Sequence, residues 1–271
     1  CIKSIIDKIE IIVVDNSGNK EFANKIESQY KNVKCILSPK NLGMGAGNNL
    51  GLKHINTDYV FILNPDVILK KNTIEEIIIA SKKIENFGLI APISDNLKYP
   101  NYKINKKIEL PNFIDPFKVD SVDGFAMILN LKKLKKIDQF KDNNFFDENI
   151  FLYLENDDLC KRINKFENIF IVPKSKINHL GASGVNKKYS EQIELSRNWH
   201  WIWSKFYFNK KHYGFLKAIF ECLPSFLSAI LKVLFYFLIN KKKKRIYFHR
   251  VLGFLNALFG KKSYHRPKID N

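Results

Sequence analysis

Residues 59–67 read YVFILNPDV, an apolar run that ends in a polar turn. The first five residues are aromatic, β-branched or leucine, and the run has the length of a buried strand. Asn64, Pro65 and Asp66 follow directly, so the Asp66 carboxylate is expected at the carboxyl end of that strand. Ligands of open α/β sheets bind beyond the carboxyl ends of the strands. We therefore expect a functional site at this edge of the predicted sheet.

Apolar runs and helical patterns alternate on both sides of this stretch. Strands are predicted at 10–14, 33–37, 59–63, 87–91, 124–130 and 169–172, and helices at 20–31, 47–55, 73–84 and 155–166. Alternation of this kind is typical of βαβ crossovers, which produce parallel strands. The predicted fold class is α/β, a Rossmann-like, mostly parallel sheet flanked by helices. Residues 92–123 show no clear period and are expected to form loops and short antiparallel pieces.

The composition suits a folded chain with a sizeable core. The 271 residues are 45% hydrophobic and 13% aromatic, which excludes a wholly disordered chain, a collagen-like fibre and a coiled coil. The four cysteines lie far apart, with no C-x-x-C pair. A disulfide framework and a zinc ribbon are therefore not expected, and a reducing compartment fits. No signal peptide is recognisable at the start of the chain.

Positive charge is concentrated near the end of the chain. Residues 201–271 hold 15 Lys and Arg but only 2 Asp and Glu, whereas the whole chain has 45 Lys and Arg and 27 Asp and Glu. Within that region, residues 222–239 carry one charge, Lys232, and KKKKR follows at 241–245. Apolar and aromatic residues interleaved with lysine are typical of a helix that lies on an anionic membrane. The alternative is a helical pair packed on the domain with solvated lysines.

We predict a globular domain over residues 1–215 and an amphipathic helical tail over 216–271. A peripheral, interfacial tail is favoured over one spanning segment at 222–239, because that stretch is near the lower length limit for a bilayer and Lys232 lies within it.

Acidic residues are the first candidates for chemistry. Asp66 suits a hard divalent cation, which prefers carboxylate oxygens and keeps some water; a turn residue is the plainer alternative. Glu155, Asp157 and Asp158 open a predicted helix, where acids also cap the helix and complement its dipole. Three carboxylates within four residues repel one another, which raises a pKa toward the range of a general base. The spacing leaves both interpretations open.

A glycine-rich stretch, NLGMGAGNN (41–49), leads into a helix. Gly43, Gly45 and Gly47 allow a ligand close to the backbone, and the helix N-terminus suits a phosphate or a hydroxyl-rich ligand. The stretch matches neither G-x-G-x-x-G nor the Walker pattern. His179 is either a metal ligand or a structural residue, and Arg197 either holds a phosphate or faces solvent.

Six motifs follow one another in order along roughly residues 1–215. They are VVDNS (13–17), NLGMGAGNN (41–49), FILNPDV (61–67), VDGFAMILN (122–130), FDENIFLYLENDDLCKR (146–162) and HLGASG (179–184). In this order they resemble the family 2 inverting glycosyltransferases, and most nearly the rhamnosyltransferase-like enzymes of bacterial envelope polysaccharide synthesis. The resemblance implies a GT-A fold, in which a Rossmann-like sheet binds a nucleotide-sugar and an acceptor side is built after it.

The resemblance also implies roles for individual residues. Asp66 stands for the acid of the DxD metal motif, with Asn64 in the place of the first Asp, and His179 lies near the metal and the diphosphate. The helix start supplies the base, with Glu155 as the first choice and Asp157 and Asp158 as the others. Asp123 and Gly124 fall on the acceptor side. The residues expected to contact the nucleotide-sugar are Asp15, Asn16, Ser17, Asn41, Gly43, Gly45, Asn48, Asn64 and Arg197.

The implied reaction is a single displacement that inverts the anomeric centre. A base takes the proton of an acceptor hydroxyl as it attacks, while Mg²⁺ or Mn²⁺ and basic groups neutralise the departing diphosphate. Two departures from the family pattern stand out. The usual Glu-Asp pair is Glu155-Asn156 here, which leaves the base open between Glu155 and Asp157. The family's first strand would precede the helix expected at the start of this chain, so we expect a sheet without an inner strand and a sequence cut at its front.

We expect an enzyme that moves a sugar, rhamnose by its nearest subgroup, from a nucleoside-diphosphate donor to a lipid-linked or polysaccharide acceptor. Its expected location is the cytoplasmic face of the bacterial inner membrane. The alternative is a catalytically inactive relative that serves as a membrane-bound assembly subunit, motivated by Asn156 and the missing first strand. No nucleic-acid partner is expected, because the basic tail is too apolar and carries no recognised motif.

Overall fold

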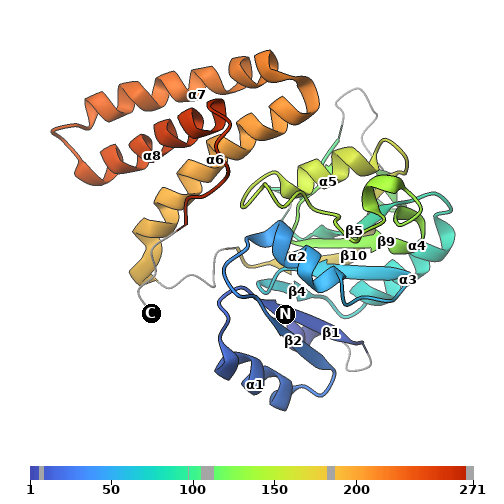
Figure 1. Ribbon diagram of the computed structural model, residues 1–271. Helices are drawn as coiled ribbons and strands as arrows, with labels where there is room; N and C mark the ends of the chain where they lie inside the picture. Colours follow the sequence, from blue (N-terminus) through green and yellow to red (C-terminus); the bar gives the residue numbers. More distant parts are fainter. Residues whose placement is uncertain (6–8, 97, 105–112, 182–186, 267–271) are drawn as a thin grey trace. The chain divides into compact units, whose positions relative to one another are not determined.

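The computed structural model describes residues 1–5, 9–96, 98–104, 113–181 and 187–266 (Figure 1). Contacts divide the chain into two compact units. The first comprises residues 1–147 and 156–183, and the second comprises residues 148–155 and 184–271. The sequence-based boundary at residue 215 therefore falls inside the second unit.

The first unit begins with a small parallel sheet. β1 (Ile11–Asp15) pairs with β2 (Val33–Leu37), and α1 (Lys20–Gln29) connects them. The side chain of Asn19 caps α1 by accepting a hydrogen bond from the Phe22 amide. Among the described residues these two strands form a sheet of their own, separate from the larger sheet.

The larger sheet is mixed. Its strands lie in the order β3 (Tyr59–Leu63), β9 (Ala126–Asn130), β5 (Leu89–Ser94), β10 (Ile169–His179) and β4 (Val67–Leu69), and β7 (Phe117–Lys118) also pairs with β10. β5 and β10 are parallel, as the alternation predicts. β9 is antiparallel to both β3 and β5, so the expectation of a mostly parallel sheet is corrected. The pattern of apolar runs could not reveal this insertion, because it reports which residues are extended and not which strands pair.

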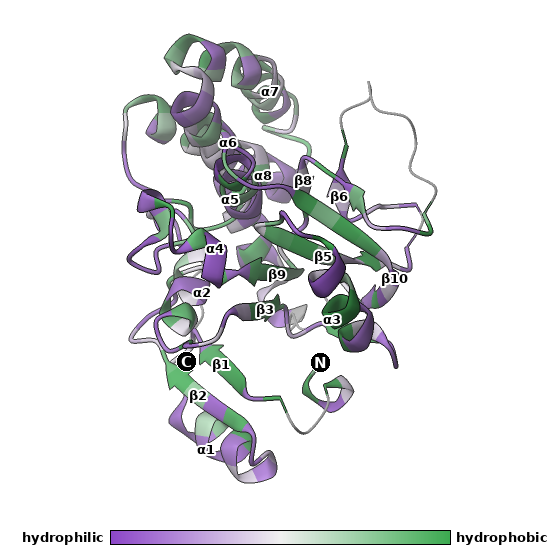
Figure 2. Cartoon of the chain, turned by 90° about the vertical axis from the view of Figure 1, so that its right-hand side faces the viewer, coloured by the Kyte–Doolittle hydropathy of each residue, from purple (hydrophilic) through white to green (hydrophobic). Residues whose placement is uncertain are grey.

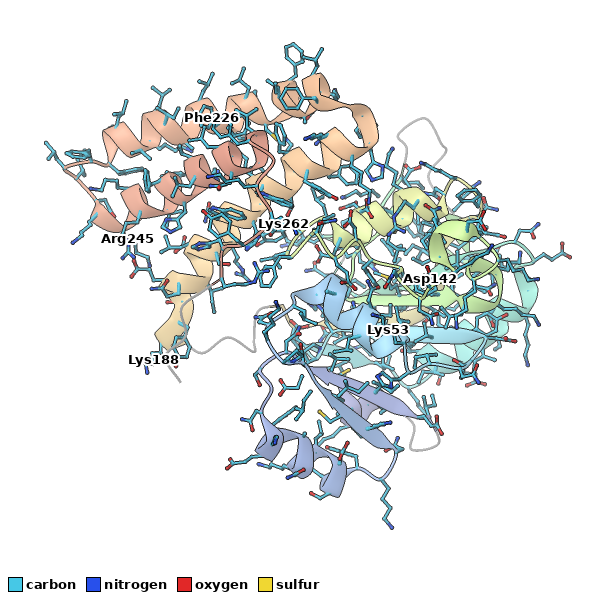
Figure 3. All side chains as sticks on the ribbon, viewed as in Figure 1. Lys53, Asp142, Lys188, Phe226, Arg245 and Lys262 are labelled. Atoms are coloured by element: carbon cyan, nitrogen blue, oxygen red, sulfur yellow. The ribbon has the colours of Figure 1, made fainter. Side chains whose placement is uncertain are left out.

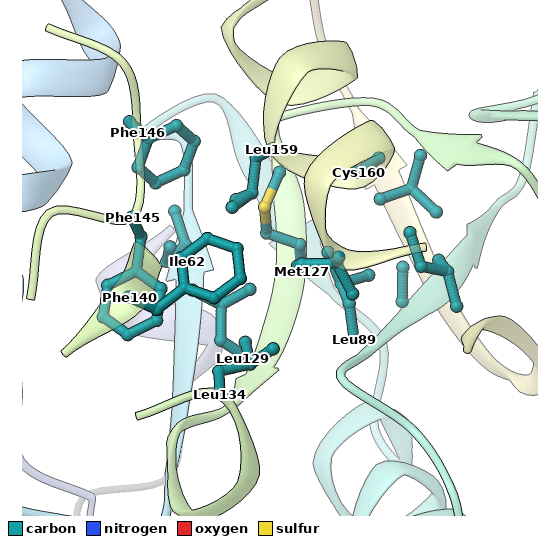
Figure 4. Close-up of a cluster of buried hydrophobic side chains, with 14 of the residues drawn as sticks. Ile62, Leu89, Met127, Leu129, Leu134, Phe140, Phe145, Phe146, Leu159 and Cys160 are labelled. Carbon is teal, nitrogen blue, oxygen red and sulfur yellow. The ribbon is translucent and has the colours of Figure 1, made fainter. Parts of the chain in front are cut away.

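Alternate residues of the central strands point to opposite faces of the sheet, as the period of two requires. Leu89, Met127 and Leu129 belong to the main core, together with the buried residues of α5 (Glu155–Ile163) (Figure 4). Ile90 and Ile128 belong to the other face, against α3 (Thr73–Lys83). Because both faces are covered, these strands are apolar almost throughout (Figure 2).

Shorter elements complete the first unit. They are η1 (Ile2–Ser4), α2 (Met44–Leu52), β6 (Tyr102–Lys103), β8 (Ser121–Val122), α4 (Leu131–Leu134) and η2 (Asp138–Phe140). The predicted helix at 155–166 ends at Ile163, and Phe166 beyond it is 58% exposed. The amides of Phe166 and Glu167 still bond to the Ile163 carbonyl, so the chain turns away from the core there.

The described part of the second unit contains three long helices and one short turn, η3 (Lys187–Tyr189). α6 (Ser190–Tyr213), α7 (Phe215–Phe235) and α8 (Lys241–Leu258) share an aromatic core that includes Trp199, Phe206 and Phe254. Gly253 of α8 faces the Trp199 backbone so closely that a Cβ atom would clash with its carbonyl oxygen. This packing places α6 with the tail helices, which explains why the unit begins well before residue 215.

α7 differs from the tail segment expected from the sequence. It begins at Phe215 and ends at Phe235, within the 222–239 stretch, and Pro224 lies inside it. Among the described residues α7 is the helix whose length and composition would allow it to cross a membrane, and 17% of its most apolar window is buried. Most of its apolar surface therefore faces away from the core of its own unit.

Candidate functional site

Three of the sequence motifs meet at the carboxyl end of β3. The Asn64 amide donates to the Phe125 carbonyl at 2.9 Å, which ties the Asn-Pro-Asp turn to the entry of β9. The Leu180 amide donates to the Asp66 carbonyl at 3.0 Å, which ties the same turn to the end of β10. The expected position of Asp66 beyond the strand is thus confirmed.

Asp66 and His179 bring two ligand-type atoms together. Nε2 of His179 lies 3.3 Å from Oδ2 of Asp66, and the two side chains are 28% and 20% exposed. The imidazole stacks on the Phe125 ring with centroids 4.0 Å apart, which fixes its plane. The described residues hold no cluster of three or more His, Cys, Asp or Glu able to bind a metal. A pair of this kind fits a cation that takes its remaining ligands from water and phosphate oxygens.

A second group of charges lies beside this pair in the first unit. Nζ of Lys103 is 2.6 Å from Oδ1 of Asp157. Burial raises the pKa of Asp123, the positive charges of Lys103 and His179 oppose this rise, and the negative charge of Asp157 adds to it. The charges of Lys103, Asp157 and His179 therefore all act on Asp123. The residue predicted for the acceptor side, Asp123, thus lies near Asp157, one of the predicted bases.

The side chain of Asn156 acts as a hydrogen-bond donor. Its Nδ2 donates a 2.7 Å hydrogen bond to the carbonyl of Val122, just before Asp123 and Gly124. An ionised aspartate could not donate this bond. A Cβ atom on Gly124 would lie 2.6 Å from Cε of Met44 and 3.3 Å from Cβ of Asn156, so this glycine lets the glycine-rich stretch, β9 and α5 converge.

Asp158 is fully buried and paired with a cation. Its side chain is 0% exposed, and Oδ2 accepts a 2.8 Å bond from Nε of Arg162, one helical turn later. Arg162 also donates to the Phe145 carbonyl. The buried pair anchors α5 to the core, and this geometry argues against the prediction of Asp158 as a proton acceptor.

Glu155 begins α5 and is 4% exposed. The two residues before it, Tyr153 and Leu154, have φ values of 70° and 68°. Left-handed backbone costs roughly 1–2 kcal/mol for each residue other than glycine. The surrounding fold therefore imposes this turn, which sets the direction in which the helix starts.

Asn16 organises the glycine-rich stretch. Its Nδ2 donates to the Gly43 carbonyl at 3.2 Å, and its Oδ1 accepts from the Leu42 amide at 3.4 Å. Oδ1 of Asn41 accepts from the Gly43 amide at 3.0 Å, and Gly43 has a φ of 85°. Gly45 is buried inside the start of α2. Nδ2 of Asn48 is buried and has no hydrogen-bond partner among the described residues.

Asp15 is held by its own turn. Its carboxylate accepts bonds from the amide and hydroxyl of Ser17, at 3.0 and 2.8 Å, and from the Asn19 amide at 2.8 Å. Burial alone would raise the pKa of Asp15, but these hydrogen bonds outweigh it and hold the pKa below its usual value. The carboxylate is thus ionised and rigidly placed at the end of β1.

Arg197 lies on α6 in the second unit. Burial raises the pKa of the Tyr153 hydroxyl, the charge of Arg197 opposes this rise, and the charge of Glu155 adds to it. Arg197 therefore neighbours the turn that precedes α5. Two other residues were missed by sequence reasoning: Lys103, which lies in a stretch without any pattern, and Phe125, whose stacking on His179 is long-range.

The sequence profile of glycosyl transferase family 2 matches residues 1–141, just over half of the chain. The chain belongs to this family. A low-salt glycan biosynthesis hexosyltransferase, Agl10 of Haloferax volcanii, is 27% identical over 191 residues, which cover 63% of this chain and 59% of that protein. An uncharacterised glycosyltransferase of Haemophilus influenzae is 29% identical over 79 residues, 28% of this chain and 32% of that protein. The chain thus matches less than two thirds of the length of either relative.

Solved structures share the fold of this family 2 chain. A mannosyltransferase from Pyrobaculum calidifontis, in complex with GDP-Man and Mn²⁺, superposes with a TM-score of 0.51 at 11% identity, over 94% of this chain and 79% of that one. GalNAc-T7, with UDP, GalNAc and Mn²⁺, superposes with a TM-score of 0.50 at 14% identity, over 84% of this chain and 53% of that one. These similarities confirm the α/β fold class with a central sheet and C-terminal helices.

Replacing Asp158 by Asn is expected to destabilise the first unit. The substitution leaves the Arg162 cation buried without its counter-charge, at a cost of roughly 3 kcal/mol. The matched change D157N removes a charge whose partner, Lys103, is 62% exposed, so its cost stays within about 1 kcal/mol. Urea unfolding of both variants provides the comparison, and equal stabilities would contradict a structural role for Asp158.

Proposed function

We propose that this chain is a nucleotide-sugar-dependent glycosyltransferase that inverts the anomeric centre. The observation that supports this most is the convergence of Asp66 and His179 at the end of β3. Diphosphate departure needs positive charge at the leaving group, and these side chains are suited to hold it there. The curated relatives support glycan synthesis, and the sequence resemblance makes rhamnose the first sugar to test.

The donor would lie along the ends of β1 and β3 and the start of α2. Asp15, Asn16 and Ser17 would face the nucleotide, with Asn16 keeping the glycine-rich stretch in place. Asn48 would bond to the donor through its unsatisfied amide. Asn64 completes the set proposed for the first unit, and Arg197, on the second unit, remains the residue proposed to bind a phosphate.

Asp66 and His179 would hold a divalent cation, Mg²⁺ or Mn²⁺. Such an ion, when bound, neutralises charge that develops on the departing diphosphate. Lys103 contributes a further cation to this neighbourhood, since it pairs with Asp157 and acts on Asp123.

The proton acceptor would be a carboxylate near the start of α5. Glu155 remains the first candidate, and Asp157 the second. Asp123 joins them because burial raises its pKa, which makes it a better base than an exposed aspartate. Asp158 is left out because Arg162 holds it in the core.

Asp66→Asn is expected to lower metal-dependent release of nucleoside diphosphate by at least about 100-fold, since it removes a charged group at the developing negative charge. It should also weaken Mn²⁺ binding, measured by electron paramagnetic resonance, without changing thermal unfolding. Asp95→Asn, at an exposed ion pair with Lys70, is the matched control. Wild-type turnover in D66N would refute the metal assignment.

Amide replacements should identify the base. Of E155Q, D157N and D123N, one is expected to lose about 10²–10⁴ in kcat while donor affinity, measured by calorimetry, survives. The kcat of the wild type should rise with pH through the pKa of that group, because the base must be ionised. Near-normal kcat in all three variants would show that no base lies in this neighbourhood.

We also propose that α7 brings the enzyme to an anionic membrane carrying a lipid-linked acceptor. Its outward face holds a row of large apolar side chains at helical spacing: Leu216, Phe220, Leu223, Leu227, Leu231 and Leu234, which are 36–71% exposed. We call this row the α7 stripe. Lys217 lies near its beginning, and Lys241–Lys244 follow its end. An apolar row bordered by lysines matches lipid tails beneath anionic head groups.

Flotation with vesicles tests this placement. The triple variant F220S/L227S/L231S should lose binding to vesicles containing anionic lipid, and wild-type binding should weaken as salt rises because the lysine contribution is screened. The control triple variant K82S/K132S/K141S removes exposed lysines of the first unit and should float like the wild type. Equal flotation of all three proteins, or concentration-dependent dimers that the stripe variant abolishes, would contradict membrane contact.

A further inference from the structure

The second unit contains a basic recess that the proposed reaction does not use. It has a volume of about 550 Å³ and an open mouth. Its lining comes from α6, α8 and the segment that follows α8: Gln192, Leu195, Arg245, His249, Tyr264, His265 and Arg266. None of these seven residues is acidic, and four of them carry or can acquire a positive charge. A recess of this size accommodates a small ligand, and its chemistry selects an anion.

The side chains offer several donors. Nη1 of Arg245 donates to Oε1 of Glu191 at 2.6 Å, which leaves its other guanidinium hydrogens for a ligand. Nδ1 of His249 is 2.9 Å from the Arg245 carbonyl and therefore carries a hydrogen. Nε2 is then the ring nitrogen left to bond to a ligand. The hydroxyl of Tyr264, on a side chain that is 59% exposed, adds another donor.

The basic groups of the recess repel one another. Burial lowers the pKa of His265, and the charges of His249 and Arg266 lower it further. The guanidinium of Arg266 lies over the Phe151 ring, with Cζ 3.5 Å from the ring centroid. The nearby acids are already paired, Glu191 with Arg245 and Glu194 with Lys242. A multiply charged anion would relieve this repulsion, and arginine forks match phosphate oxygens geometrically.

The recess also lies close to the apolar end of α7. Phe237, Leu238 and Ile239, which join α7 to α8, are 60%, 90% and 68% exposed. α8 begins two residues later, so Arg245 and His249 lie only about 6 and 12 Å along the helix from its start. Apolar side chains of an interfacial helix reach roughly 5–10 Å into the membrane boundary. An anion held by Arg245 and His249 would thus lie within about three helical turns of exposed apolar side chains.

We propose that this recess binds the phosphate or diphosphate group of a membrane lipid. That the lipid is the sugar acceptor rests on the proposed function, whereas binding of the anion does not.

Binding can be measured on the full chain in EDTA, which prevents metal-dependent binding at the donor site. The probes are inorganic pyrophosphate, geranyl diphosphate and UDP. Binding of each probe is measured by calorimetry and by the imidazole NMR signals of His249 and His265. The test variant is R245Q/H249Q. K242Q/K243Q removes two charges from the same helix outside the recess, and D66N disables the proposed donor site.

Pyrophosphate is expected to raise the pKa of both imidazoles and to bind about tenfold more tightly at pH 6 than at pH 8, because protonated histidines favour the anion. R245Q/H249Q should weaken binding at least about tenfold, and the two control variants should not. Geranyl diphosphate should bind more tightly than pyrophosphate and than UDP.

Unchanged imidazole signals at saturating pyrophosphate would overturn the site. Binding lost in D66N but not in R245Q/H249Q would assign the anion to the donor site instead. Equal affinity for pyrophosphate and geranyl diphosphate would overturn the lipid assignment. If the chain binds geranyl diphosphate in the recess but transfers no sugar, the proposed function fails while the proposal of an anion site in the recess stands.

Discussion

The antiparallel insertion of β9 between β3 and β5 is the constraint on which the site depends. Antiparallel neighbours exchange ends, so the entry of β9 lies beside the exit of β3. The segment Val122–Phe125 is thereby placed against the Asn-Pro-Asp turn, and the Asn64 to Phe125 hydrogen bond locks the two together. With β9 elsewhere, Asp123 and Phe125 would not lie near Asp66.

β10 completes the arrangement from the other side. It pairs in parallel with β5 and in antiparallel with β4, and its last residue, His179, lies opposite Val67. A histidine at the end of a long strand thus arrives beside a carboxylate that is distant in sequence. The pairing of β10 with its neighbouring strands places His179 there, and stacking on the Phe125 ring fixes the plane of its imidazole.

The start of α5 shows how one short acidic run is divided among different tasks. Asn156 bonds to the backbone before β9, Asp157 pairs with the partly solvated Lys103, and Asp158 is buried against Arg162. Neighbouring positions of a helix point about 100° apart, so adjacent residues meet a strand, the site neighbourhood and the core in turn. The apparent departure at Asn156 is explained by its role as a hydrogen-bond donor.

The sequence by itself determined the parts of this protein that depend on local pattern. The alternation of apolar runs and helices, the position of Asp66 at a strand end, the glycine-rich start of α2 and the basic, apolar character of the tail can all be predicted from residue type and spacing. The family resemblance added the order of the motifs. Only the tertiary structure decided that the large sheet is mixed, that α6 joins the tail helices, that Asp158 is buried, and that Lys103 and Phe125 join the site. Strand partners, burial and charge pairs depend on residues far apart in the chain, and a periodic pattern carries no information about which distant segment provides them.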